Sequence, residues 1–395
     1  MICRILILLA CISGIMTPPA YPGTPSSANG IGTLVPDDSG RARGMGGAGI
    51  AVDDGKSFLM GNPALISSFK KPSYGFSVSY DRVNTGLSTG GSTTCARTDP
   101  TIIRFVLPLY RGIALGWGLT PYSKTDVKLQ VPVPDGAIYT DTMNSTGGIN
   151  LSSFQLAASF LSFRAGAAIN YYFGEIKEEW TRDFAGAEGI NNSTEYIKKN
   201  YKGYGTTVGV LARFSSLSLG AGYTTRSSLD ETKFMQPAGE SMSDIPILTD
   251  TVRLPSTIRL GAMMDVSKQL SAALDFSRSG WSDAARTDRE KEMYEDTWMI
   301  GGGIRYIPSV SPTAGYMSGI PLSLGFRYGT LYYKSYPKIN TIREMSLTLG
   351  IELPFVNKSG GLISTYEIGK RGDTDSNGWD ETFFKIGVSL AGTIK

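Results

Sequence analysis

The chain has 395 residues, with 41% hydrophobic residues, 18% charged residues and a formal net charge of +3. Soluble domains carry about 25% charged residues, so the low charge argues against an ordinary soluble protein, and the nearly neutral balance argues against a nucleic-acid partner. Histidine is absent. Because histidine is the commonest general base and metal ligand, we expect no enzyme, no metal site and no cofactor.

The first residues have the features of a secretory signal peptide. Arg4 provides a positive charge, Ile5–Ile15 form an apolar core, and small residues follow between Ala20 and Ala28. Cleavage is expected near either of these two alanines, and we assign residues 1–28 to the signal. No later apolar run approaches the roughly 20 residues that a membrane helix requires, so a membrane-spanning form of this chain has to be a β-barrel.

Residues 29–71 do not have the pattern of a strand. A glycine-rich run between Gly40 and Gly55 permits close backbone packing and positive φ, and apolar residues such as Ile50, Phe58 and Leu65 follow the same stretch. We expect so apolar a segment to lie inside the barrel, as a hatch that plugs the lumen. A nucleotide-binding glycine loop would need a preceding strand and a following helix, and neither is predicted here.

From residue 72 to residue 395, apolar and polar residues alternate with a period of two, which is typical of strands with one buried or lipid-facing side. We count fourteen strands, an even number typical of outer-membrane barrels. Their predicted centres are Val78, Phe105, Leu115, Leu156, Ile169, Val208, Leu219, Leu260, Leu274, Ile300, Leu324, Leu349, Tyr366 and Val388. The fold class is therefore all-β, a 14-stranded antiparallel transmembrane β-barrel.

The connections alternate between short and long, as they do in barrels with short periplasmic turns and long outer loops. The predicted short turns are Tyr110–Gly112, Leu161–Ser162, Ser215–Ser216 and Val266–Gln269. The predicted long loops are Val83–Asp99, Tyr122–Gly147, Glu175–Asn200, Arg226–Arg253 and Gly280–Glu295. Tryptophans 117, 281 and 298 are expected in the aromatic girdles at the membrane boundaries.

Charged residues fall on the polar side of several predicted strands. An arginine that faces lipid at mid-depth costs about 2–4 kcal/mol, so these side chains should face the lumen, and we expect Arg259 and Arg327 to pair with acidic groups. The predicted lumen charges are Arg104, Arg213, Arg259, Arg305, Arg327, Asp275 and Glu352. One predicted outer loop is unusually apolar, and its candidate ligand contacts are Phe234, Met235, Ile245 and Leu248.

Three short motifs resemble the FadL family of outer-membrane transporters for long-chain fatty acids and hydrocarbons. The first is the glycine-rich run Gly44–Gly49, the second is Val52–Asp54, and the third is Asn62–Ala64. A later stretch, from Leu254 to Ser282, resembles a strand pair of the same family. The resemblance implies a hatch with gating residues at Gly46, Gly47, Asp53, Asp54, Asn62, Pro63 and Ala64.

The resemblance also implies a function, which is passive uptake of hydrophobic small molecules across the outer membrane through a hatch-gated barrel. The expected partners are a hydrophobic ligand, outer-membrane lipids and the barrel assembly machinery. An alternative is a PorV-like barrel that acts as an anchor or shuttle in protein secretion, and a channel for polar solutes is a third reading. An apolar cavity above the hatch would favour transport, whereas a solid polar lumen would favour an anchor.

Overall fold

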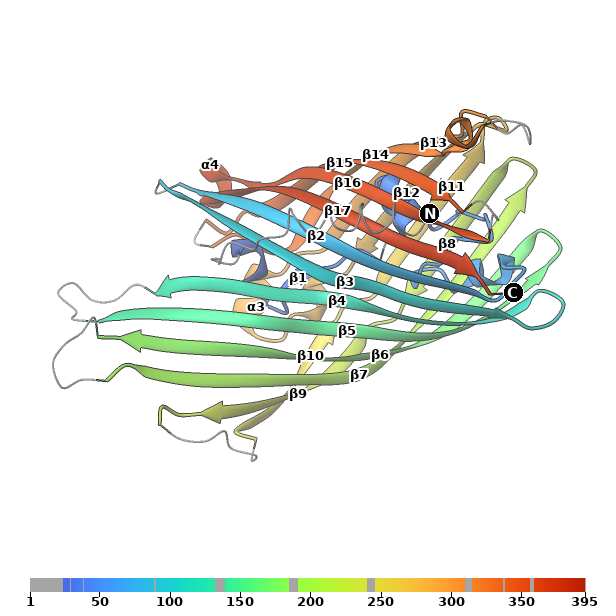
Figure 1. Ribbon diagram of the computed structural model, residues 1–395. Helices are drawn as coiled ribbons and strands as arrows, with labels where there is room; N and C mark the ends of the chain where they lie inside the picture. Colours follow the sequence, from blue (N-terminus) through green and yellow to red (C-terminus); the bar gives the residue numbers. More distant parts are fainter. Residues whose placement is uncertain are drawn as a thin grey trace.

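The computed structural model describes residues 24–28, 30–37, 39–88, 90–131, 139–184, 191–239, 246–309, 315–336, 338–355 and 359–394. Strands dominate it (Figure 1). They are β1 (Thr33–Leu34), β2 (Ser73–Leu87), β3 (Ser92–Pro108), β4 (Ile113–Val131), β5 (Thr140–Phe160), β6 (Phe163–Asp183), β7 (Ser193–Phe214), β8 (Leu217–Thr224), β9 (Ser227–Gln236), β10 (Leu248–Leu254), β11 (Thr257–Asp265), β12 (Leu270–Ser279), β13 (Thr297–Tyr306), β14 (Leu322–Lys334), β15 (Thr341–Pro354), β16 (Gly360–Asp373) and β17 (Trp379–Thr393).

Strands β2 to β17 form the wall of a closed antiparallel barrel. Both β8 and β9 pair with β7, while β11 pairs with β8 and β10 pairs with β9. Strands β8 and β9 therefore form one wall strand with a break, and so do β10 and β11. The sixteen strands thus occupy fourteen positions in the wall. The pairing of β17 with β2 closes the ring. The predicted fourteen-stranded barrel is confirmed, and all fourteen predicted centres lie in wall strands.

The alternation in the sequence explains the two faces of the wall. Leu322, Leu324 and Phe326 of β14 are exposed, whereas Ser323 and Arg327, which alternate with them, are buried in the lumen. An outward ring of apolar side chains suits contact with lipid, and polar lumen residues avoid the cost of facing it. Glycines on the lumen side allow close packing, because a Cβ on Gly325 would lie 2.1 Å from the backbone nitrogen of Gly46.

The short turns lie where the sequence predicts them, but most of the predicted long loops are wrong. The chain from Val83 to Asp99 is strand except for a turn near Gly90, and Tyr122–Gly147, Glu175–Asn200 and Arg226–Arg253 are largely strand as well. Strand β7 has 22 residues and β12 only 10, whereas crossing a membrane takes about 9–11. Strands β4 to β7 therefore extend well beyond the opposite wall (Figure 1).

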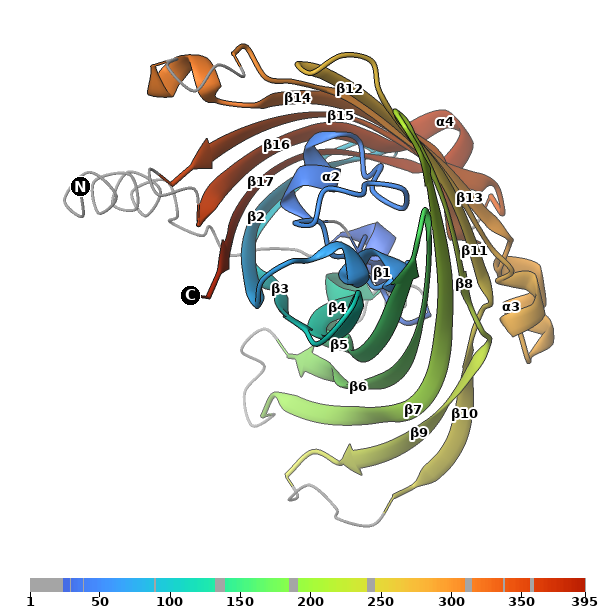
Figure 2. The same cartoon turned by 90° about the vertical axis from the view of Figure 1, so that its right-hand side faces the viewer.

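The N-terminal segment, which we define as residues 24–71, lies inside the ring (Figure 2). It contains three short helices besides β1, namely η1 (Pro25–Ser27), α2 (Gly40–Gly44) and η2 (Pro63–Ser68). Helix α2 contacts β14 to β17, and η2 contacts β3 to β7. Apolar side chains of the segment, among them Met45 and Leu65, are almost fully buried. The part of the segment from Gly40 onward fills the lumen near the end of the barrel that carries the short turns, whereas η1 and β1 lie further toward the opposite end.

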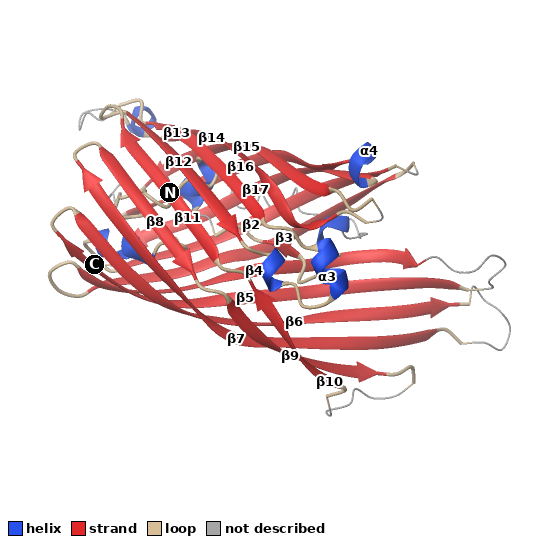
Figure 3. Ribbon diagram, turned by 180° about the vertical axis from the view of Figure 1, so that it is seen from behind, coloured by secondary structure: helices blue, strands red, loops and turns tan. Residues whose placement is uncertain are grey.

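The remaining helices lie in connections between strands. They are η3 (Ser282–Ala284), α3 (Asp288–Met293), η4 (Tyr316–Gly319) and α4 (Thr374–Asn377). Figure 3 shows α3 beside the wall and α4 at the end of the barrel opposite the short turns. In the part of the chain that the structure describes, every helix is too short or too polar to cross a membrane.

Candidate functional site: the lumen and its N-terminal segment

Asn62 forms a fixed corner in the N-terminal segment. Its side-chain Nδ2 donates hydrogen bonds to the carbonyl oxygens of Ile50, at 2.8 Å, and Val210, at 3.2 Å. Its Oδ1 accepts a hydrogen bond from the backbone N–H of Ala64 and caps helix η2. Pro63 begins that helix, where its missing N–H costs nothing. Asn62 and Ala64 are both fully buried, so this corner is tied to strand β7 of the wall.

Gly46 and Gly47 occupy a part of the segment that passes close to the wall. Both have positive φ, at 71° and 86°. The N–H of Gly46 donates to Thr348, and its carbonyl accepts a hydrogen bond from Arg327 at 3.3 Å. A Cβ on Gly46 would lie 2.3 Å from the carbonyl oxygen of Phe326. Glycine is therefore required here both by the backbone conformation and by the approach to β14.

The two aspartates, Asp53 and Asp54, pair with different arginines. Asp53 is buried and lies 2.5 Å from Arg164 and 3.6 Å from Arg213. Asp54 pairs with Arg41 of the same segment and accepts hydrogen bonds from the backbone N–H groups of residues 56 and 57. Burial disfavours its charged form, but these donors outweigh burial, and the pKa of Asp54 lies below its ordinary value. The carboxylates thus hold the segment both internally and to the wall.

Glu352 of β15 is shared by two arginines. It lies 2.6 Å from Arg41 of the N-terminal segment and 2.7 Å from Arg305 of β13. All three side chains are largely buried, with exposed fractions between 11% and 16%. The triad therefore links two wall strands to the segment through hydrogen bonds between charged groups, which are stronger than bonds between neutral groups.

The other expected lumen charges also contact the N-terminal segment, and one of them, Arg259, does so without the acidic partner expected for it. Asp275 accepts hydrogen bonds from the backbone N–H groups of Gly49 and Ile50, at 2.7 and 2.8 Å. Arg104 pairs with Asp37 at 3.0 Å and donates to the carbonyl of Phe58. These contacts agree with the inward orientation that the alternation predicts. The segment is therefore held on most sides by charged groups of the wall.

Arg259 is the exception, because the acidic partner expected for it is not found among the described residues. Its guanidinium donates to the hydroxyl of Thr224 at 3.1 Å, and its side chain borders Gly61 of the N-terminal segment. It lies at the edge of a cavity of about 320 Å³ on the far side of the segment from the short turns. A lumen cation without a carboxylate partner has capacity to bind an acceptor group of a ligand.

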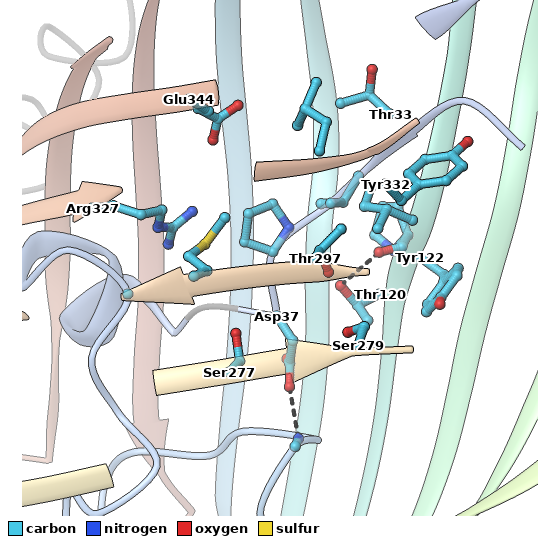
Figure 4. A pocket seen from close by; sticks show the side chains of 18 of the residues that line it. Thr33, Asp37, Thr120, Tyr122, Ser277, Ser279, Thr297, Arg327, Tyr332 and Glu344 are labelled. Carbon is cyan, nitrogen blue, oxygen red and sulfur yellow. Dashed lines mark hydrogen bonds between the residues drawn. The ribbon is translucent and has the colours of Figure 1, made fainter. Parts of the chain in front are cut away.

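The cavity has a mixed lining. Apolar and aromatic residues on its surface include Leu34, Met60, Leu151, Tyr122, Tyr172, Trp281 and Tyr332. Hydroxyl-bearing residues include Thr120, Thr207, Thr224, Thr257, Ser277, Ser279 and Thr297. Figure 4 shows labelled lining residues from the N-terminal segment and from strands β4, β12, β13, β14 and β15. Pockets for small organic ligands commonly combine apolar surface with a few polar groups in this way.

The structure adds an anchor that the sequence does not reveal, at Ser26 of helix η1. Its backbone N–H donates to Glu381 at 3.1 Å, its hydroxyl accepts from Arg371 at 3.0 Å, and its carbonyl accepts from Tyr333. Arg371 also pairs with Glu344. Ser26 and the rest of helix η1 lie within residues 1–28, the range that the sequence assigns to the signal peptide. Strand alternation could have placed Arg371 in the lumen, but a lone serine carries no comparable signal.

Trp281 does not lie in an aromatic girdle, so that expectation is wrong. It is 1% exposed and stacks on Tyr332, with ring centroids 4.2 Å apart. The inward positions Ser277 and Ser279 of β12 share its parity, which could have indicated its direction. Trp117 and Trp298 contact outward aromatic residues, Phe105 and Tyr328 respectively, as a girdle requires.

The candidate ligand contacts in the outer loop need a correction. Phe234 and Met235 lie in strand β9, and Leu248 begins β10, so none of them belongs to a loop. Adjacent strand residues point to opposite faces, and therefore Phe234 and Met235 cannot line one groove together. Ile245 lies outside the described residues. Phe234, Met235 and Leu248 are not among the residues that line the cavity.

The wall has a seam where β3 and β4 separate. Their ladder covers only Ile103–Pro108 and Ala114–Leu119, although both strands continue beyond it. Past the ladder, β1 of the N-terminal segment pairs with β4. Side chains bridge the seam, with Lys124 lying 2.6 Å from Asp99. The seam borders the cavity, because Lys124 and Arg97 are among the lining residues.

These features define a transmembrane β-barrel whose lumen holds its own N-terminal segment beside a cavity that the segment helps to line. Solved structures share this fold. The toluene transporter TbuX of Ralstonia pickettii gives a TM-score of 0.58 at 16% identity, covering 92% of this chain and 99% of its own. The toluene transporter TodX of Pseudomonas putida gives a TM-score of 0.62 at 14% identity, covering 91% of this chain and 99% of its own. A FadL homologue of Pseudomonas aeruginosa gives a TM-score of 0.59 at 14% identity, covering 91% of this chain and 99% of its own.

At the level of the fold, the predicted likeness to FadL-type barrels is confirmed. A family model described as BamG matches residues 1–392, and the chain belongs to the BamG family. No curated protein matches the sequence.

Proposed function

We propose that this protein resides in the outer membrane and takes up hydrophobic small molecules passively, with the N-terminal segment as its hatch. The observation that carries the proposal is the cavity of about 320 Å³ enclosed by the barrel above that segment. Its volume falls at the lower end of the range for small-molecule sites. The toluene transporters and the FadL homologue share the fold, which is consistent with a ligand that is a hydrocarbon or a fatty acid.

The lining offers apolar surface for part of a ligand, beside charged groups such as Arg97, Lys124 and Glu344. Met60, Leu151 and the rings of Tyr122 and Tyr172 offer apolar surface. The hydroxyl groups and Arg259 would orient any polar end. Transport through the barrel further requires the segment to shift, because it fills the lumen between the cavity and the short turns. The corner at Asn62 is the point from which such a shift would be controlled, since it joins the segment to β7.

The test compares Asn62→Ala with a control variant, Asn84→Ala. Asn84 is exposed on β2 and accepts only a hydrogen bond from Thr94. Barrel assembly is followed by heat-modifiable gel mobility, and uptake by the rate at which a radiolabelled fatty acid or toluene enters cells that express each variant. We expect Asn62→Ala to assemble and to change the uptake rate, whereas the control changes neither. Normal uptake by an assembled Asn62→Ala barrel would count against hatch gating.

A second candidate function is that of an anchor or interaction protein, and the density of charged contacts in the lumen favours it. The N-terminal segment is fixed to the wall through Arg41, Asp53 and Asp37, among others. Such a network suits a permanent plug better than a moving hatch. The name of the BamG family also hints at involvement in barrel assembly. In this reading the barrel assembly machinery is a functional partner.

Two measurements separate the candidates. Lipids and other small molecules are extracted from purified protein and identified by mass spectrometry. The amounts of other outer-membrane barrels are compared in cells with and without this chain. A bound hydrophobic molecule together with unchanged barrel amounts supports uptake. Ligand-free protein together with depleted barrels supports the assembly role.

A further inference from the structure

The barrel wall has a notch between β10 and β14. Strands β12 and β13 end opposite each other, at Ser279 and Thr297, and β11 pairs with β12 only as far as Thr257. Beyond this level β10 continues on one side and β14 on the other. In the described ladders β10 pairs with β9 alone. No strand therefore closes the wall between β10 and the upper part of β14.

Residues 280–296, which we call the strap, fill this notch. Trp281 points inward, lines the cavity and stacks on Tyr332 of β14. Ala284 and Ala285 are buried beside it. Helix α3 follows with a capping box formed by Thr287 and Glu290, and it presents charged side chains to solvent. The strap is thus a small folded unit with an apolar inner surface and a polar outer surface.

The two edges of the strap are held in different ways. On the β14 side, the backbone N–H of Glu295 donates to Tyr332, and Tyr294 forms a β-bridge with Tyr333. On the β10 side, the backbone N–H of Gly280 donates to Ser256 at the base of the strap, and above it Arg286 forms an ion pair with Asp250, 2.6 Å apart. A second pair, Arg226 with Asp283, is exposed at the same side. The Arg286–Asp250 pair is partly exposed, at 20% and 43%, and such ion pairs hold weakly compared with backbone pairing. Above Gly280 the β10 edge is therefore the one that can release.

Trp281 carries a second indication. Its Nε1 is buried and has no hydrogen-bond partner among the described residues. A buried unpaired donor destabilises the state that contains it. The unpaired donor therefore offsets part of the stability that the stacking of Trp281 on Tyr332 gives to the closed position of the strap. Lifting the strap would expose this donor to water or to a ligand.

We propose that the strap is a movable cover over a second entrance to the cavity, fixed on β14 and held closed on β10 by Arg286 and Asp250. The notch begins just above outward Ile258, Phe276 and Trp298, at the edge of the apolar belt. The entrance thus opens where the membrane surface meets water, and it suits a molecule that partitions into the membrane. The identity of that molecule rests on the uptake function proposed above, whereas the opening itself does not.

The experiment measures access to a cysteine placed below the strap. Ser277→Cys lines the cavity, and Cys95→Ser removes the free thiol that the structure places in a strand. The rate of modification by N-ethylmaleimide is measured on the full barrel in membranes, with and without Arg286→Glu. We expect the rate to rise at least about threefold in Arg286→Glu, because loss of a partly exposed ion pair shifts a closed–open equilibrium by that order.

Two controls make the result specific. Arg182 and Asp141 form an exposed ion pair on β6 and β5, with a distance of 2.8 Å, away from the notch. Arg182→Glu should leave the rate unchanged. The charge-swapped pair Asp250→Arg with Arg286→Asp should restore the slow rate. Heat-modifiable gel mobility confirms that each variant forms a barrel.

Each outcome decides the proposal. Faster labelling in Arg286→Glu, with restoration by the charge swap, supports it. An unchanged rate, or an equal rise in Arg182→Glu, overturns it. Uptake of the hydrophobic dye N-phenylnaphthylamine is measured on the same variants. Faster labelling without faster dye uptake supports the movable strap and counts against the uptake function. The two proposals can therefore fail separately.

Discussion

At the scale of single residues, Glu352 combines burial with two charged partners, Arg41 and Arg305. Glu352→Gln removes the carboxylate that Arg305 pairs with and leaves Arg41 with Asp54 alone. Breaking a buried ion pair costs about 3–5 kcal/mol, so we expect a clear fall in the denaturant midpoint of heat-modifiable mobility. Glu175→Gln is the control, because Glu175 pairs with Lys198 at an exposed position. Equal midpoints for the two variants would contradict the role of Glu352.

Gly46 offers a second residue-scale prediction. Gly46→Ala places a Cβ 2.3 Å from the carbonyl oxygen of Phe326, whereas Gly239 has a similar positive φ and open space around it. The backbone penalty is shared by Gly239→Ala, so the difference between the variants isolates the close contact. Overpacking costs about 1–3 kcal/mol. We expect Gly46→Ala to speed proteolysis within the N-terminal segment, and equal cleavage rates would rule out this contact.

Alternation explains why most lumen charges could be predicted and why their partners could not. The parity of each strand places Asp275 and Arg327 on the lumen side, and the structure agrees. Partners depend on how the N-terminal segment folds inside the barrel, and strand parity contains no information on that. Arg259 therefore received an acidic partner in the prediction that the structure does not provide. Trp281 was misplaced because tryptophan alone is typical of girdles.

At the scale of elements, the N-terminal segment should respond to acid. The pKa of Asp54 lies below its ordinary value of 3.8 in the folded chain. Its contribution is fully present above pH 3.8 and is lost as the pH falls through the lower, folded pKa. We expect hydrogen exchange in residues 41–57 to accelerate below about pH 4 before the wall strands change. Asp54→Asn should show faster exchange already at neutral pH.

The orientation of the connections gives another element-scale prediction. A cysteine at Ser282 in the strap should react with an impermeant reagent added outside the cell. A cysteine at Lys268, in the short turn between β11 and β12, should react only after the outer membrane is opened. If Lys268→Cys were labelled in intact cells and Ser282→Cys were not, the barrel would have the opposite orientation in the membrane.

Element positions could be predicted well, but element lengths could not. The hydrophobic alternation marks the lipid-facing part of each strand, and that part lies where expected. Beyond the membrane, both faces of β5, β6 and β7 become polar, as at the adjacent residues Glu178 and Glu179 of β6. The pattern then resembles that of a loop, although the backbone ladder continues. Backbone pairing with neighbours extends these strands, and single-strand patterns do not record it.

At the scale of the whole molecule, the barrel is asymmetric in height. The wall from β4 to β7 continues beyond the level at which β12 and β13 end. The tall side carries a polar outer face, and the low side carries the notch and the strap. Access to the cavity from outside is therefore easiest over the low side. This arrangement follows from strand length alone and does not depend on which proposed function holds.

The burial of Ser26 has a consequence for maturation of the protein. Removal of the chain up to Ala28 would take away the N–H, hydroxyl and carbonyl that Glu381, Arg371 and Tyr333 bind. Of the two predicted cleavage positions, the one near Ala20 keeps this turn in the finished protein. We therefore expect the mature chain to begin before Thr24, and Edman sequencing of protein purified from membranes would show it. A start at Asn29 would mean that export machinery discards a part that the folded barrel uses.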